Sequence, residues 1–304
     1  MGKDGTRIWN SMARKWTALL WVAVAALCAC EKESTLGEYQ QTLVVEGWIE
    51  NDDFPVVIVT KTMPVSSEFQ YAGNLEDYLV RWAKVTVSDG ETSVVLTGRY
   101  DEMYFPPYVY TTSRIRGEVG KTYYLTVEYE DFCATASTTV CEPPDVESFR
   151  VDKCADNDTL YQITARFRDR PQEKNYYQLF TKVGEKTRHY LGSFLGSIDD
   201  EALKEGLTEL PVYRGHMMDE EDYTPYFCKG EKVSVKFAQL DADAYRFWDQ
   251  YTKSESLSSN MFLSVPASMP SNIEGGVGYW SGYGAVNAHF VVGYLKNKVG
   301  NSPK

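Results

Sequence analysis

The sequence has few of the side chains that metal binding and nucleophilic catalysis require. It contains three histidines, His189, His216 and His289, which lie far apart in the chain, and it has no CxxC pair. Structural zinc sites need clustered Cys and His ligands, so we expect no metal site and no cofactor. GxSxG and HExxH motifs are also missing, and no pair of carboxylates stands out. The sequence therefore predicts a protein that is not an enzyme.

Positive charge is also scarce. The chain has 31 Lys and Arg against 43 Asp and Glu, and without residues 1–29 the balance becomes 27 to 42, a net charge of −15. Nucleic-acid binding depends on clustered Lys and Arg that neutralise phosphates, so we expect no nucleic-acid partner. An acidic surface also does not adhere to anionic lipid. Any hold on a membrane must therefore come from acyl chains.

No apolar run is long enough for a transmembrane helix. The run that starts at Thr17 has ~13 residues, whereas a helix that spans a bilayer needs about 20. It follows Arg14 and Lys15, ends in Leu27-Cys28-Ala29-Cys30, and gives way at once to the polar Glu31-Lys32-Glu33-Ser34. This order of basic, apolar and small residues is typical of a signal peptide.

The same segment resembles a bacterial lipoprotein signal, in which cleavage before Cys30 frees its amine and thiol for acylation. We interpret residues 1–29 as the signal peptide, with Met12 as an alternative start, and residues 30–40 as a lipidated tether. The predicted location is the outer membrane, anchored through Cys30. The acid-Lys-acid order of residues 31–33 slightly favours the cell surface over the periplasmic face. An ordinary secretory signal and an N-terminal membrane anchor are the alternatives.

Four cysteines follow the predicted lipidation site: Cys133, Cys141, Cys154 and Cys228. An even number in an envelope protein permits disulfides. Cys133 and Cys141 are predicted to share one extended segment and to lie ~26 Å apart at about 3.3 Å per residue. Any bridge would then join them to Cys154 and Cys228 rather than to each other. Free or buried thiols are an equal alternative.

Residues 41–142 carry a succession of short strand patterns with turns between them. Aromatic residues make up 14% of the chain and β-branched residues are frequent, which favours sheet over helix. Asp89-Gly90 predicts a hairpin between two of the patterns. The patterns occupy residues 43–49, 55–60, 83–88, 93–97, 122–129 and 134–140. The segment therefore predicts an immunoglobulin-like or fibronectin-like β-sandwich.

Pro143-Pro144 marks the predicted boundary to a second domain at residues 145–298, because proline interrupts sheet pairing and stiffens a joint. This domain is predicted to be β-rich with one or two short helices. Asp241 can cap a helix whose apolar residues include Phe247 and Trp248. A second helix is expected at residues 200–207. Strand patterns occupy residues 147–151, 161–167, 176–181, 232–237 and 288–292.

Two aromatic segments are candidate contacts for a ligand or a partner. Tyr104, Phe105 and Tyr108 belong to a proline-bearing connection between strands, which can present flat apolar faces. Tyr279 and Trp280 lie in a dense glycine cluster, where we expect tight turns and close backbone approach. Packing of these rings against the protein itself is the alternative for both segments.

Several of these features together resemble a Bacteroidetes lipoprotein family known as domain of unknown function 4249. The family signature Asn-Ile-x-Gly-Gly-x-Gly is matched closely near the end of the chain, although a phenylalanine is commoner where Trp280 stands. The matching segments are residues 43–49, 85–90, 120–123, 245–248 and 271–280. The resemblance implies a lipid-anchored envelope protein, often encoded near TonB-dependent outer-membrane receptors. It implies no catalytic residues.

We therefore expect a non-enzymatic outer-membrane lipoprotein that acts as an accessory or substrate-binding partner of a TonB-dependent nutrient receptor. The alternative is a structural surface or adhesion module in which the sandwich is a spacer. A glycan hydrolase is a third and weaker hypothesis, because no acidic pair is singled out among the 43 carboxylates.

Overall fold

The computed structural model separates residues 1–40 from residues 41–304, and only parts of the second range are described. The predicted signal peptide, Cys30 and the predicted tether lie outside the described residues. The described part is mainly β, with three sheets and one α-helix, which confirms the predicted fold class at that level. The described residues are 41–62, 77–155, 157–184, 189–203, 206–215, 223–258 and 269–294.

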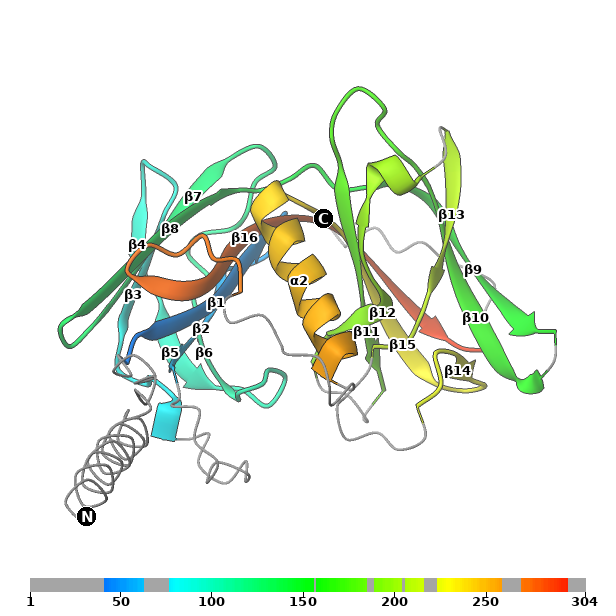
Figure 1. Ribbon diagram of the computed structural model, residues 1–304, viewed down its shortest axis with the longest axis horizontal. Helices are drawn as coiled ribbons and strands as arrows, with labels where there is room; N and C mark the ends of the chain where they lie inside the picture. Colours follow the sequence, from blue (N-terminus) through cyan, green and yellow to red (C-terminus); the bar gives the residue numbers. More distant parts are fainter. Residues whose placement is uncertain are drawn as a thin grey trace, which may run out of the picture. The chain divides into compact units, whose positions relative to one another are not determined.

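The largest sheet has eight strands in the order β12-β11-β15-β16-β1-β2-β6-β5 (Figure 1). Four of its strands, β1, β2, β11 and β15, correspond to predicted ones, whereas β5, β6 and β12 were not expected. The bounds are β1 Leu43–Glu50, β2 Val56–Lys61, β5 Thr97–Tyr100, β6 Tyr108–Thr111, β11 Tyr176–Val183, β12 Leu191–Asp199, β15 Lys232–Leu240 and β16 Gly276–Val291. This sheet therefore combines strands from both ends of the described chain.

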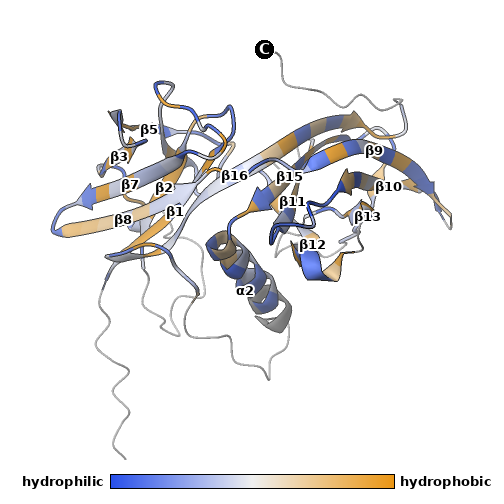
Figure 2. Ribbon diagram, turned by 90° about the horizontal axis from the view of Figure 1, so that it is seen from above, coloured by the Kyte–Doolittle hydropathy of each residue, from blue (hydrophilic) through white to orange (hydrophobic). Residues whose placement is uncertain are grey.

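Strand β16 joins the two halves of this sheet. Its residues 276–283 pair in parallel with β1, and its residues 284–291 pair antiparallel with β15. Figure 2 shows β16 as one long strand that passes from β1 to β15. The prediction of tight turns in the glycine cluster holds only at Gly275, which lies in a turn with a φ of +75°, and is wrong for the later glycines, which lie within the strand. The predicted close backbone approach is confirmed, since a Cβ at Gly282 would lie 2.5 Å from the carbonyl oxygen of Thr139.

A second sheet, β4-β3-β7-β8, shares a hydrophobic core with the β1 half of the large sheet. Side chains alternate along a strand, so β7 buries Tyr123, Leu125 and Val127 on one face. These residues pack with Leu43 and Val45 of β1. The bounds are β3 Lys84–Ser88, β4 Ser93–Val95, β7 Thr122–Tyr129 and β8 Phe132–Thr139.

The turn between β3 and β4 is the predicted Asp89-Gly90 hairpin. Gly90 has a φ of +91°, which lies in the left-handed region that glycine adopts without strain. The Asp89 carboxylate accepts hydrogen bonds from the backbone N–H groups of Glu91 (3.1 Å) and Thr92 (2.7 Å). Lys121 pairs with the same carboxylate at 2.7 Å. The lysine and the backbone donors lower the pKa of Asp89 to about 2, so the turn is held by a charged carboxylate.

A third sheet, in the order β13-β10-β14 with β9 also paired to β10, shares a second core with β11, β15 and the end of β16. Aromatic rings dominate this core; Phe167 and Phe237, for example, meet edge to face at 4.8 Å. Strand β16 contributes Trp280 to the first core and Phe290 to the second. The bounds are β9 Asp145–Cys154, β10 Asn157–Arg168, β13 Leu207–Val212 and β14 Phe227–Cys228. The division into domains at Pro143-Pro144 stays a prediction.

The α-helix predicted after Asp241 is confirmed as α2, Ala242–Ser258. The Asp241 carboxylate accepts a hydrogen bond from the backbone N–H of Ala244 at 2.7 Å, as a helix N-cap does. Helix α2 packs against β11, β12, β15 and β16 of the large sheet. The second predicted helix is limited to a 3-10 turn, η2 Asp200–Ala202, because Leu203 is already extended and β13 begins at Leu207.

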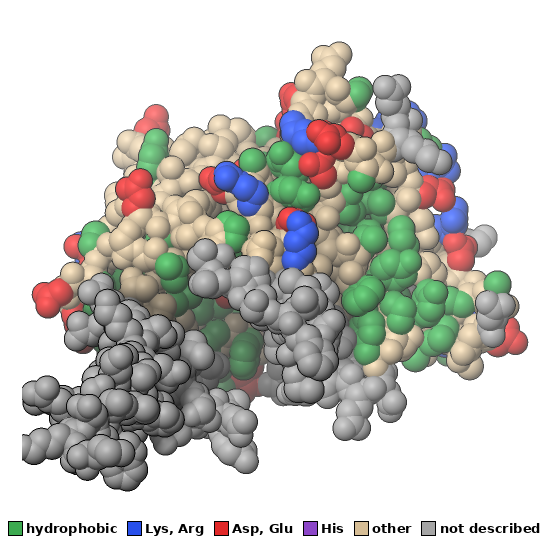
Figure 3. Space-filling model, in the orientation of Figure 1, with side chains coloured by type: hydrophobic (Ala, Val, Ile, Leu, Met, Phe, Trp, Pro, Cys, Tyr) green, Lys and Arg blue, Asp and Glu red, His purple; other side chains and the backbone are tan. Residues whose placement is uncertain are grey.

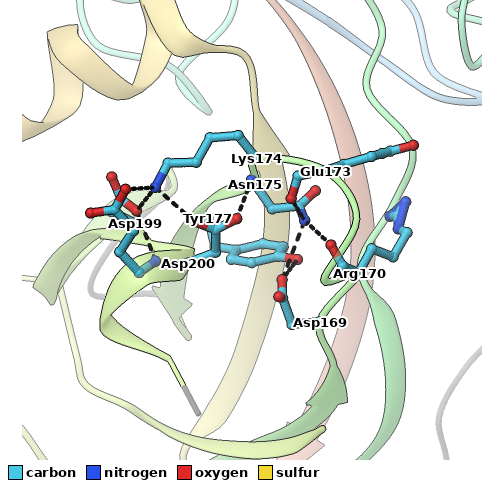
Figure 4. Close-up of polar contacts among 9 residues, drawn as sticks. Asp169, Arg170, Glu173, Lys174, Asn175, Tyr177, Asp199 and Asp200 are labelled. Atoms are coloured by element: carbon cyan, nitrogen blue, oxygen red, sulfur yellow. Dashed lines mark hydrogen bonds and ion pairs between the residues drawn. The ribbon is translucent and has the colours of Figure 1, made fainter. Parts of the chain in front are cut away.

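A polar network ties the loop before β11 to the turn after β12 (Figure 4). Asn175 is 1% exposed, and its side-chain amide donates to the backbone carbonyls of Arg170 (2.8 Å) and Glu173 (2.9 Å). The amide oxygen of Asn175 accepts from Gln239 at 2.9 Å. Next to it, Lys174 pairs with Asp199 and with Asp200. These contacts fix the edge of the sheet on which α2 rests.

Replacing Asn175 with leucine is expected to destabilise the chain by about 2 kcal/mol, because the buried carbonyls and the Gln239 amide lose their partner. Guanidinium denaturation followed by circular dichroism measures this loss. The control is Lys174→Met at the adjacent, more exposed position, where surface ion pairs contribute little. Equal shifts for the two variants would contradict the role assigned to Asn175.

Candidate functional site

A cavity of about 180 Å³ lies on the face of the large sheet that α2 covers. Eight of its fifteen lining residues are Trp, Tyr or Phe, and the charged ones include two glutamates and two lysines. Mostly aromatic walls with a few polar groups are typical of small-molecule sites. The lining residues are Glu46, Trp48, Glu50, Ile58, Met103, Tyr104, Phe105, Phe180, Lys182, His189, Tyr190, Lys236, Trp248, Tyr279 and Tyr283. The cavity is therefore the candidate site of this chain.

Side chains alternate between the two faces of a strand, and this decides which residues of β1 line the cavity. Leu43, Val45 and Ile49 are fully buried in the first core, so residues 46, 48 and 50 face the opposite side of the sheet. Glu46 pairs in register with Tyr279 of β16, and Glu50 pairs with Tyr283. One face of two adjacent strands thus brings two carboxylates and three aromatic rings into the cavity.

Helix α2 closes the aromatic wall. The indole N–H of Trp248 donates a hydrogen bond to the Tyr283 hydroxyl at 3.0 Å. The Trp248 ring lies 5.3 Å from Phe180 and 5.9 Å from Tyr279 between centroids. Phe247 approaches Tyr279 to 4.4 Å. These ring contacts hold the wall in one arrangement, because each ring packs against a neighbour from another element.

Glu46 is the most isolated charge of the cavity. Its Oε1 accepts a hydrogen bond from the Tyr279 hydroxyl at 2.9 Å, and no Lys or Arg of the described residues forms an ion pair with it. Burial raises the pKa of Glu46, and the Tyr279 hydrogen bond opposes that rise. Burial also raises the pKa of Tyr279 well above its ordinary value. The Tyr279 hydroxyl therefore stays protonated and donates to the carboxylate.

The opposite end of the cavity carries its own cations. Lys236 forms an ion pair with Glu50, and the two side chains are 13% and 4% exposed. The Lys236 ammonium lies 4.7 Å from the centroid of the Tyr190 ring, and that of Lys182 lies 5.9 Å from it. Burial lowers the pKa of His189, so this imidazole is neutral at pH 7. The Tyr190 ring is thus already occupied by lysine side chains of the protein.

Of the five aromatic residues expected at a contact site, three line the cavity: Tyr104, Phe105 and Tyr279. Tyr108 lies elsewhere, with its hydroxyl donating to the carbonyl of Arg81 at 2.9 Å. Trp280 is fully buried in the first core. Its indole N–H donates to the carbonyl of Tyr123 at 3.0 Å.

Sequence reasoning missed Glu46, Trp48 and Glu50 on β1. The signal was present, because these residues alternate with apolar ones in a strand that the sequence did indicate. An outward strand face usually meets solvent, and nothing in the sequence tells that α2 and β16 cover this one. Lys236 and Trp248 were missed as site residues for the same reason.

The four cysteines of the described residues form no disulfide with one another. Cys133 lies within β8 and Cys141 follows the end of that strand, as the predicted shared segment requires. The Cys141 thiol points to the carbonyl of Thr139 at 3.9 Å, and burial raises its pKa to about 12. A bridge to Cys154 or Cys228 stays a prediction.

Two other kinds of feature do not occur among the described residues. They contain no group of three or more His, Cys, Asp and Glu side chains placed to hold a metal ion. None of their helices combines the length and the apolar character that a membrane crossing requires.

Fold and site together define a mainly β protein with a small, partly open aromatic cavity beside one helix. The chain belongs to the family described as a domain of unknown function (DUF4249), whose model matches residues 31–288. This match confirms the resemblance to that domain family, whereas the lipoprotein and Bacteroidetes context stays a prediction. Among curated proteins, none matches the chain.

Proposed function

We propose that this chain is a non-enzymatic outer-membrane lipoprotein that captures a small ligand as an accessory of a TonB-dependent nutrient receptor. The observation that carries the proposal is the aromatic cavity of about 180 Å³ between the large sheet and α2. Its rings are fixed by contacts from several elements, so the site is preformed, as binding sites for small molecules usually are. Cys30 anchors the protein to the membrane in this proposal.

Two other observations support it. The family match starts at residue 31, directly after the proposed lipidation site. The two sheets that share the first core fit an immunoglobulin-like sandwich, which we propose as the platform that carries the cavity away from the membrane.

A hydrophobic surface over β12, β13 and β14 supports a protein partner (Figure 3). Phe194 of β12 is 64% exposed, and its ring lies 5.7 Å from that of Tyr223. Exposed apolar patches of this kind often mark contact surfaces. In the proposal this surface meets the receptor.

Co-purification tests the receptor partnership. The full-length chain, extracted in mild detergent from its own host, is expected to bring down a TonB-dependent receptor. The variant Phe194→Ser is expected to reduce the recovered receptor, whereas Trp82→Ser, at a residue that is 88% exposed just before β3, is expected to leave it unchanged. Repeated absence of any receptor would count against this part of the proposal.

Replacing Cys30 with alanine is expected to move the protein from the membrane fraction to the soluble fraction. Without the thiol no diacylglyceryl group can be attached, and stable anchoring needs at least two acyl chains. Fractionation and labelling with a palmitate analogue measure the effect. Cys28→Ala is the matched control in the same segment and is expected to keep both the label and the membrane location. Label on the Cys30→Ala protein would show that the anchor is elsewhere.

A further inference from the structure

The charges of the cavity are unevenly distributed along β16. Glu46 lies at the level of Tyr279, and Glu50 at the level of Tyr283. Lys236 pairs in register with Asn287, farther along the same strand. On β11, Lys182 pairs with Ser234, which in turn pairs with His289. The cavity therefore has an acidic end near Tyr279 and a basic end near Lys182.

The basic end is complete without a ligand. Lys236 neutralises Glu50, and both Lys236 and Lys182 lie over the Tyr190 ring. A cation over an aromatic face near a carboxylate is a favourable arrangement. At this end the protein itself provides the cation, the ring and the carboxylate.

The acidic end has the ring and the carboxylate but lacks the cation. Glu46 has the Tyr279 hydroxyl as its hydrogen-bond partner and no ion-pair partner in the described part of the chain. No described Lys or Arg lies over the rings of Trp48, Trp248 or Tyr279, whereas seven such pairs occur elsewhere in the same residues. Glu46 is half-buried, and a carboxylate withdrawn from water is stabilised by a cation beside it, so this end suits a positive charge that comes from outside.

We propose that the acidic end of the cavity binds an organic ammonium group, with the positively charged nitrogen of the ligand against the Glu46 carboxylate and the surrounding aromatic rings. The inference rests on the proposed capture function and adds the chemical class of the ligand. Aromatic rings around a carboxylate favour a weakly hydrated cation such as a methylated amine over a metal ion, since rings replace water poorly for a small hard ion. The small volume of the cavity fits one such group and a short substituent.

Choline and its neutral analogue 3,3-dimethylbutan-1-ol are the probes, because they share one shape and differ in the positive charge. Titration of the full-length chain in detergent is followed by tryptophan fluorescence, since Trp48 and Trp248 line the cavity. We expect choline to bind about tenfold more tightly than the alcohol, which corresponds to ~1.4 kcal/mol. Tetramethylammonium, which is smaller, is expected to show that the charged group alone suffices for binding.

Glu46→Gln tests the role of the negative charge, because it removes the charge and keeps the size of the side chain. The Tyr279 hydroxyl can still donate to the glutamine oxygen, so the cavity is expected to keep its shape and the alcohol its affinity. Choline affinity is expected to fall about tenfold, to the level of the alcohol. Glu128→Gln on β7, outside the cavity and with a side chain that is 48% exposed, is the matched control and is expected to leave choline binding within about twofold.

Three results would overturn the proposal. The first is that 3,3-dimethylbutan-1-ol binds as tightly as choline. The second is a Glu46→Gln protein that binds choline as before. The third is the absence of saturation by either ammonium probe up to ~10 mM, which is weaker than typical small-ligand sites. If the unaltered chain recovers the receptor but binds neither ammonium probe, the ligand class is rejected and the accessory function stands. If the chain binds the ammonium probes but recovers no receptor, the accessory function is rejected and the ligand class stands.

Discussion

Replacing Gly278 with alanine is expected to destabilise the chain by about 4 kcal/mol or more, a large fraction of the roughly 5–15 kcal/mol by which a domain of ordinary stability stays folded. Gly278 has a φ of +120°, which residues with side chains rarely adopt. A Cβ there would lie 1.9 Å from the carbonyl oxygen of Val45, its register partner on β1. The obstacle is backbone rather than a flexible side chain, so relief requires β1 and β16 to move apart.

The control for this prediction is Gly90→Ala. Gly90 also has a positive φ, of +91°, but a Cβ added there in the β3–β4 turn would meet no heavy atom within 4 Å. The substitution is expected to lower the free energy of unfolding by about 1 kcal/mol, because only the unfavourable backbone conformation of alanine contributes. Soluble yield and chemical denaturation compare the two variants. A Gly278→Ala protein as stable as Gly90→Ala would mean that β1 and β16 do not pair in this register.

Replacing Trp280 with alanine is expected to cost about 3–5 kcal/mol, as for other large aromatic residues truncated in a core. Its side chain is fully buried between the two sheets of the first core. Its ring also fills the space over Gly47, where a Cβ would lie 2.8 Å from the indole. Its removal leaves a cavity and takes the hydrogen-bond donor from the carbonyl of Tyr123.

Trp82→Ala is the matched control for Trp280, because Trp82 is 88% exposed. It is expected to change stability by less than about 0.5 kcal/mol. Trp280→Phe should fall between the two, since an aromatic ring remains but the donor to Tyr123 is lost. The melting temperatures of the three variants, measured by calorimetry, test this expected order of stability. A Trp280→Ala protein that melts with the Trp82→Ala protein would show that Trp280 does not lie in the core.

Local patterns predicted much of the secondary structure. The Asp89-Gly90 turn and the Asp241 cap depend on neighbours in sequence, so their signals survive folding. Strands with alternating burial, such as β7, were also evident. Strands β12 and β13 were missed, because they lack a clear alternation and are specified by pairing with distant partners.

The candidate site was only partly predictable. Tyr104, Phe105 and Tyr279 were recognised as aromatic residues in unusual segments, and all three line the cavity. Trp280, next to Tyr279, was placed with them but points to the opposite face of β16, because consecutive side chains alternate along a strand. Without the strand assignment for the glycine cluster, sequence alone could not separate the two.

The family, the β-rich class, the capped helix and the glycine cluster near the end of the chain can all be recognised from local sequence patterns. Tertiary structure alone decided what the cluster does. Its glycines let β16 lie against the backbones of β1 and β8, and β16 then continues beside β15. Residues 46 and 236 meet in one cavity through that strand. Pairing between strands more than 200 residues apart depends on the packed core, and no local pattern encodes it.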